Sequence, residues 1–159
     1  MVINKLDDND DNIVTLGQIK KLQLLTKIEF PGDYIEFLVQ HNGGIPEPNF
    51  FEIPNQDGDG SYVDLFFGIG VPSYANLEYI LETYKGRLPK EFIPIGEDPG
   101  GNLICIGTQA PYIGSIYFWD HHDELDEKGL SKMDMSNMYW LADNLFEFID
   151  NLQEPEDLL

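Results

Sequence analysis

Residues 30–44 read FPGDYIEFLVQHNGG, and this stretch carries the signals for both ends of one helix. A helix can begin at Pro31, because the first turn makes no use of the backbone N–H that proline lacks. Gly43 and Gly44 then suit the left-handed backbone conformation that commonly closes a helix. Between these ends, apolar residues recur at positions i, i+3, i+4 and i+7, in Tyr34, Phe37, Leu38 and His41. The stretch therefore predicts an amphipathic helix that packs on a core, with His41 as a packed, hydrogen-bonded imidazole.

Three further helices are expected around this one. Thr15 followed by Gln18 fits a capping box, so a helix should begin there, with Ile19, Leu22 and Leu25 as its buried stripe. Residues 76–84 repeat apolar side chains at helical spacing. Residues 141–152 carry the clearest amphipathic stripe of the chain, and Pro155 ends it.

Short apolar runs between the helices predict strands at residues 50–53, 62–67, 92–95, 103–106 and 115–119. Residues 99–119 are uncharged, but their glycines and prolines divide them into two short runs typical of a β-hairpin and not of a membrane span. The element order favours an α+β fold, in which helices pack on an antiparallel or mixed β-sheet. We expect one domain over residues 15–159, preceded by a flexible acidic segment over residues 1–14.

The composition of the 159 residues, 42% hydrophobic and 13% aromatic, is sufficient for one packed core. A single cysteine, Cys105, excludes an intramolecular disulfide, and the first residues lack the features of a secretory signal, so we expect a cytoplasmic protein. Cys105 lies in an apolar run and is expected to behave as a small hydrophobic residue.

The chain carries 29 acidic and 9 basic side chains, a formal net charge of −20. Half of this excess lies beyond Trp119, where twelve acidic residues face two lysines. Such a chain repels nucleic acid and anionic membranes, because binding a phosphate backbone requires lysine and arginine. The same field attracts a basic protein partner, although solubility alone is the simpler explanation of the charge when it is taken by itself.

Two acidic segments resemble metal sites and fail on specific residues. Residues 55–60, NQDGDG, resemble the start of an EF-hand loop, but the twelfth position is Phe66 where a bidentate glutamate is required. We expect an acidic inter-strand turn there, and a weak calcium site stays an alternative. Asp120, His121, His122 and Asp123 are adjacent at a strand end, so their side chains diverge. We therefore expect no metal or other cofactor.

No catalytic arrangement stands out in the sequence. Residues 96–101, GEDPGG, lack the lysine of a phosphate-binding loop and are expected to form an inter-strand turn. Any chosen pair among 29 carboxylates is weak support for acid–base catalysis. We expect a binding protein and no enzyme. The alternative from another class is a metal-dependent hydrolase that uses Asp120, His121 and Asp123.

Several segments together resemble a known family. After residues 30–44, these are YVDLFFG at 62–68, IGEDPGGNLICI at 95–106, IYFWDH at 116–121 and the apolar stripe at 141–152. Their order and spacing resemble the SUKH superfamily, which includes yeast cell-wall assembly regulators and many bacterial immunity proteins. The likeness covers residues 15–152. One departure precedes the second helix, where the family's Leu-Gly-x-x-Leu-Pro is replaced by residues 26–31, TKIEFP.

The resemblance implies an α+β domain that binds proteins and has no expected enzymatic activity. Immunity proteins of this family neutralise a cognate toxin, often a basic nuclease, which an acidic surface can cover. A scaffold or regulator with no toxin partner is the alternative within the family. Gly43 and Gly44 are assigned to folding, and the oligomeric state stays open. The candidate contact residues are Asp57, Asp59, Asp64, Glu97, Asp98, Asp120, Asp123 and Glu124, with Tyr62 and Trp119 as aromatic anchors.

Overall fold

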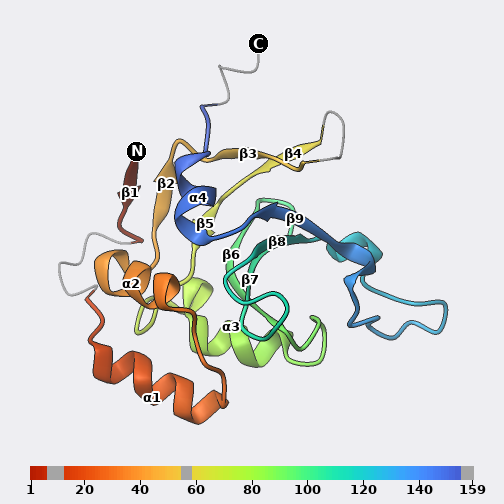
Figure 1. The fold of residues 1–159 in the computed structure, drawn as a ribbon, viewed down its shortest axis with the longest axis horizontal. Helices are drawn as coiled ribbons and strands as arrows, with labels where there is room; N and C mark the ends of the chain where they lie inside the picture. Colours follow the sequence, from red (N-terminus) through yellow and green to blue (C-terminus); the bar gives the residue numbers. More distant parts are fainter. Residues whose placement is uncertain (7–12, 55–58, 155–159) are drawn as a thin grey trace.

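A five-stranded antiparallel sheet forms the centre of the fold in the computed structural model, which describes residues 1–6, 13–54 and 59–154 (Figure 1). Its strands lie in sequence order, each hydrogen-bonded to the next. The hairpin expected in the uncharged stretch is confirmed, because the third and fourth strands of the sheet pair antiparallel there. The strands are β5 (Leu65–Phe66), β6 (Phe92–Glu97), β7 (Leu103–Gly107), β8 (Ile116–Trp119) and β9 (Met138–Ala142).

Two small antiparallel pairs flank this sheet. β1 (Val2–Asn4) pairs with β2 (Ile45–Glu47), and β3 (Phe50–Glu52) pairs with β4 (Gly60–Tyr62). The first pair corrects the expected boundary of the domain, because β1 is part of the fold and Leu6 and Val14 are buried in its core. Residues 7–12 of the expected flexible segment lie outside the described residues.

The helices are α1 (Leu16–Thr26), α2 (Gly32–His41), α3 (Leu77–Tyr84) and α4 (Leu145–Asp150). The capping box is confirmed: the Gln18 backbone N–H donates to the Thr15 hydroxyl at 3.2 Å, and the Thr15 backbone N–H donates to the Gln18 side chain at 2.8 Å. Single-turn 3-10 helices lie in two of the connections. They are η1 (Ser73–Ala75) between β5 and α3, and η2 (His121–Asp123) and η3 (Met135–Asn137) between β8 and β9.

Three sequence-based expectations about the helices were wrong in detail. Leu25 is 65% exposed and does not belong to the buried stripe of α1. His41 is also exposed, although its ring lies 5.3 Å from that of Phe37 and partial burial lowers its pKa. The expected helix over residues 141–152 begins only at Leu145, because the Asn144 side chain caps it by accepting from the Glu147 N–H at 2.9 Å. Leu141 instead belongs to β9.

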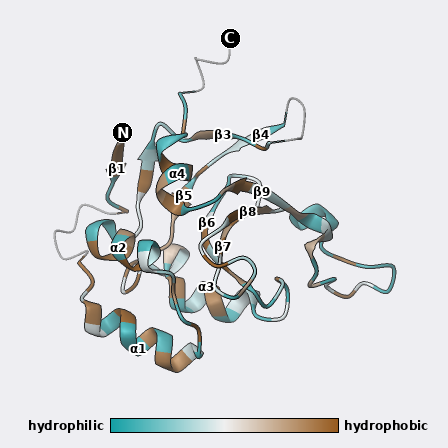
Figure 2. Ribbon diagram, viewed as in Figure 1, coloured by the Kyte–Doolittle hydropathy of each residue, from teal (hydrophilic) through white to brown (hydrophobic). Residues whose placement is uncertain are grey.

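The two faces of the sheet are covered by different helices. Phe118 and Trp119 are neighbours in β8, so they point to opposite faces. Phe118 lies 5.9 Å from Phe51, between rings, and Phe51 lies 5.4 Å from Phe148 of α4. On the other face, Trp119 meets the ring of Tyr84 at the end of α3 at 5.8 Å. Figure 2 shows the hydrophobic character of β7 and β8, which are buried at nearly every position.

Candidate protein-binding surfaces

Acidic residues lie on either side of β4 and at the end of β6. The Asp64 backbone N–H donates to the Glu97 carbonyl at 2.8 Å, which brings these two acidic residues to neighbouring positions. Asp59 immediately precedes β4 and is exposed. Tyr62 ends β4 with 39% of its surface exposed, and its ring packs edge-on against Phe50. We call Asp59, Tyr62, Asp64 and Glu97 the acidic edge.

Within the acidic edge, the surroundings of Glu97 disfavour the ionised form of its carboxyl group. Partial burial raises the pKa of Glu97, and the neighbouring carboxylates of Asp64 and Asp98 raise it further. None of Asp59, Asp64 and Glu97 has an ion-pair partner among the residues that the structure describes. A cation placed beside Glu97 would therefore relieve like-charge repulsion and favour its ionised form.

Asp98 has a structural role in the turn between β6 and β7, which corrects its expected place among the contact residues. Only 6% of its surface is exposed. Its carboxylate accepts from the Ser61 hydroxyl at 2.8 Å and from the Gly100 backbone N–H at 2.9 Å. It also accepts from the backbone N–H and the side-chain amide of Asn102, at 2.8 and 2.9 Å. These four bonds hold the inter-strand turn and tie it to β4.

Trp119 and Glu124 are likewise removed from the contact surface by burial. Trp119 is 1% exposed, so it cannot serve as an aromatic anchor for a partner. Glu124 is 7% exposed and binds Arg87 through two bonds, from Nε to Oε2 at 2.8 Å and from Nη2 to Oε1 at 2.9 Å. The Arg87 guanidinium lies over the rings of Tyr84 and Trp119, at 4.6 and 5.7 Å from their centroids. This cluster fixes the segment after β8 to the end of α3.

The segment that follows β8 lies against the turn between β6 and β7. The His121 backbone N–H donates to the Asn102 side-chain oxygen at 3.1 Å, and His121 Nε2 lies 2.9 Å from the Gly100 carbonyl oxygen. The fold thereby brings residues 97–102 close to residues 120–123. A single partner that binds at this edge of the sheet could contact both segments. Asp123 is exposed, and Asp120 is partly exposed. Asp57 lies outside the described residues.

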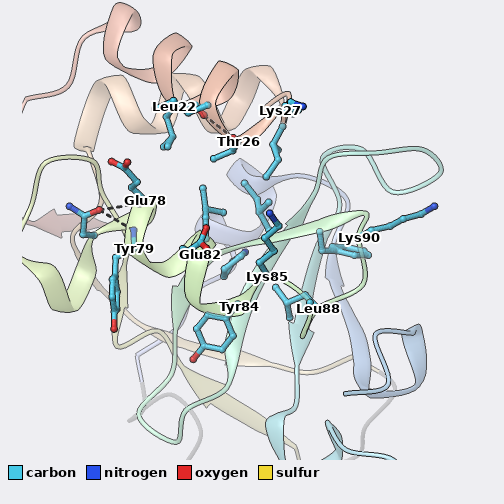
Figure 3. A pocket seen from close by; sticks show the side chains of 18 of the residues that line it. Leu22, Thr26, Lys27, Glu78, Tyr79, Glu82, Tyr84, Lys85, Leu88 and Lys90 are labelled. Atoms are coloured by element: carbon cyan, nitrogen blue, oxygen red, sulfur yellow. Dashed lines mark hydrogen bonds between the residues drawn. The ribbon is translucent and has the colours of Figure 1, made fainter. Parts of the chain in front are cut away.

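The structure also contains a groove that sequence reasoning missed. It lies between α1 and α3 and has a volume of about 1170 Å³ (Figure 3). Its lining includes Leu25, Tyr79 and Met133, which are 65%, 64% and 45% exposed, and Lys27, Lys85 and Lys90. One signal was present: Leu25 and Lys27 lie at the end of α1, but nothing local shows which residues face α3. We call this the α1–α3 groove.

Comparison with known proteins identifies the family of this domain. The sequence pattern of the SMI1/KNR4 family (SUKH-1) matches residues 13–151. This chain belongs to that family. A relative is the SPbeta prophage-derived uncharacterized protein YokK of Bacillus subtilis (strain 168), 28% identical over 161 residues that cover 91% of this chain and 78% of the relative. The expected SUKH assignment and the α+β fold are thus confirmed.

The SUKH-1 residues that close α2 are structural. The Asn42 side chain donates to the Ile69 carbonyl and accepts from the Ile69 N–H, both at 2.8 Å. A Cβ at Gly43 would lie 2.7 Å from the carbonyl oxygens of Phe66 and Phe67, so only glycine permits this approach to β5. The end of α2 is therefore fixed against the sheet by side-chain hydrogen bonds and by close backbone packing.

The residues of the hydrolase alternative do not converge in this SUKH-1 domain. The Asp120 carboxylate caps η2 by accepting from the His122 N–H at 3.0 Å. His121 turns its ring toward the Gly100 carbonyl, as described above. In residues 1–6, 13–54 and 59–154, no three histidine, cysteine or carboxylate side chains are placed to hold one metal ion. The possible calcium loop at residues 55–60 lies mostly outside these ranges.

No helix within the described ranges has the length and apolar character needed to cross a membrane.

Proposed function

We propose that this SUKH-1 domain is an immunity protein that binds a basic toxin domain and neutralises it. The observation that carries this proposal is the acidic edge, where Asp59, Asp64 and Glu97 lack cationic partners within the described residues. Asp120 and Asp123 add negative charge in the segment that contacts the turn at residues 98–102. A toxin that binds nucleic acid has a basic groove, and these carboxylates are suited to bind its lysine and arginine side chains.

Family membership and the relative support the same function. The SUKH superfamily includes bacterial immunity proteins, and YokK is described as derived from a prophage. The net charge of −20 would raise the encounter rate with a basic partner by roughly 10 to 1,000-fold at low salt. The partner-facing residues in this proposal are Asp59, Tyr62, Asp64, Glu97, Asp120 and Asp123, with Tyr62 as the aromatic anchor.

A regulatory or scaffolding role without a toxin is the second candidate, because the matched family carries the name of SMI1/KNR4. Genomic context separates the two. A toxin-like reading frame next to this gene favours immunity, and its absence favours a regulator.

The test of the immunity proposal is charge reversal at the acidic edge. We expect the domain to rescue growth when it is co-expressed with the adjacent toxin and to co-purify with it. The double variant Asp64→Lys/Glu97→Lys should weaken the complex by roughly 10 to 100-fold, with a smaller loss at 0.5 M salt. Titration calorimetry of the purified partners measures both values.

The matched control is Glu78→Lys/Glu82→Lys, which makes the same change in net charge on exposed residues of α3. It should preserve growth rescue and lower the affinity only slightly. The proposal is wrong if no neighbouring gene product binds the domain. The assignment to the acidic edge is wrong if both double variants weaken the complex equally.

A further inference from the structure

The α1–α3 groove exposes apolar side chains, as a binding site does. Leu25, Tyr79 and Met133 expose between 45% and 65% of their surface along it, although its deeper residues, such as Leu22 and Leu88, are buried. Exposed apolar side chains that gather in one hollow, and are not scattered singly, mark an interaction surface. The volume of about 1170 Å³ exceeds that of most small-molecule pockets, which reach about 1,000 Å³. The groove is also partly open to solvent, as a site for a protein segment would be.

The lining of the groove has more basic than acidic side chains, whereas the chain as a whole is strongly acidic. Lys27, Lys85 and Lys90 line it, a third of the nine basic residues in a chain with 29 acidic ones. None of these three lysines has an ion-pair partner in the described part of the chain. The acidic Glu78 and Glu82 line the groove from α3, and Figure 3 shows Glu78 and Tyr79 at the opposite end from Lys27 and Lys90.

Helix ends explain only part of this arrangement. Lys27 and Lys85 are the C-cap residues of α1 and α3, where a positive charge offsets the negative end of the helix dipole. Lys90 lies in the connection to β6, so no helix end accounts for its position. The two helices end on the same side of the groove (Figure 1), and Figure 3 shows Lys27 and Lys90 toward that side, with Lys85 nearer the middle.

We propose that the α1–α3 groove binds an amphipathic helix of a partner protein, with apolar side chains on the groove floor and carboxylates facing Lys27, Lys85 and Lys90. A groove walled by two helices suits a third helix of about 10 to 12 Å diameter. The C-terminal end of such a helix carries a partial negative charge and belongs at the lysine end. The chain as a whole has a net charge of −20 and repels an acidic ligand elsewhere on its surface, so binding is confined to the groove.

This inference is independent of the immunity proposal, because it uses a separate surface and a partner of opposite charge. The probe is a fluorescein-labelled helical peptide of about 18 residues, with leucines at helical spacing and three glutamates in its last turn. A second peptide replaces the three glutamates by lysines. Fluorescence anisotropy at 50 and 300 mM salt measures the affinity of each peptide for the full chain.

Two pairs of variants localise the binding. Lys85→Glu/Lys90→Glu changes the charge of the groove, and Lys20→Glu/Lys21→Glu makes the same change on exposed positions of α1 that do not line it. Leu25→Ser removes an apolar contact in the groove, and Leu24→Ser removes a similarly exposed leucine (70%) that does not line it. Lys27 is left unchanged, because its φ of 57° belongs to the cap of α1.

We expect saturable binding of the glutamate peptide and weaker binding of the lysine peptide. The groove variants Lys85→Glu/Lys90→Glu and Leu25→Ser should each weaken binding of the glutamate peptide about tenfold, equivalent to about 1.4 kcal/mol. Their matched controls should change it less than about twofold. The proposal is overturned if the glutamate peptide does not bind, if the lysine peptide binds as well, or if groove and control variants behave alike.

Discussion

Asp98 accepts four hydrogen bonds within the turn between β6 and β7 while almost none of its surface meets solvent. Replacing it by alanine leaves two backbone N–H groups, a hydroxyl and an amide without their acceptor. Because unpaired buried donors are costly, Asp98→Ala should lower the free energy of unfolding by about 2 to 4 kcal/mol in urea denaturation. Asp64→Ala, at an exposed neighbour, should change it by less than about 0.5 kcal/mol. Equal losses would show that Asp98 has no structural role.

Tyr34 is buried in α2, and its hydroxyl makes no hydrogen bond to a described residue. Burial also raises the pKa of this phenol far above its usual range. Because an unpaired buried hydroxyl opposes folding, Tyr34→Phe should raise the free energy of unfolding by about 1 kcal/mol and the melting temperature by about 2 to 4 °C. Calorimetry measures the shift, and Tyr62→Phe at an exposed position is the control. A fall in stability after Tyr34→Phe would contradict this account.

At the scale of elements, the contact between Arg87 and Glu124 connects the end of α3 to the segment after β8. The hydrogen bond from Arg87 is the main reason that the pKa of Glu124 lies below its ordinary value of 4.5, and the Ser131 hydroxyl adds to the effect by donating at 2.7 Å. A carboxyl whose pKa is lower in the folded state stabilises the fold above pH 4.5. This contribution is lost as the pH falls through the folded-state pKa.

The variant Glu124→Gln should therefore be less stable than the parent by about 1 to 2 kcal/mol at pH 7, since one partner is half-exposed and solvent screens the pair. The difference should shrink below pH 4.5 and approach zero once Glu124 is protonated in the parent. Urea denaturation across pH 3 to 7 measures it, with Asp123→Asn at an exposed neighbour as the control. A loss that does not depend on pH would mean that packing, and not charge, dominates.

At the scale of the whole molecule, one acidic chain presents two surfaces of different character. The hairpin of β3 and β4, which bears Asp59 and Tyr62, and the helix α1 lie on different sides of the fold (Figure 1). The acidic edge is suited to a basic partner, and the α1–α3 groove to an acidic, apolar one. The domain could then hold two partners without competition, provided that neither partner reaches across α3.

Elements with strong local signals were predictable from the sequence. Thr15 and Gln18 predicted the start of α1, and Asn42 and Gly43 predicted the end of α2. These predictions were possible because a helix cap depends on residues within one turn. β9 was missed, since only Asp143 and Asn144 separate its apolar residues from those of α4 and short apolar runs fit either element. The pairing of β1 with β2 was missed because about 40 residues separate them.

The sequence by itself determined the α+β class, the positions of most helices and strands, and the negative charge. It did so because caps, glycine turns and apolar periodicity act between near neighbours in the chain. Only the tertiary structure decided which charged and apolar side chains are available to a partner. It buried Trp119 against Tyr84, paired Glu124 with Arg87, and left Leu25 exposed in the groove that Lys85 also lines. Burial depends on contacts between elements far apart in sequence, so availability for binding cannot be read from local patterns.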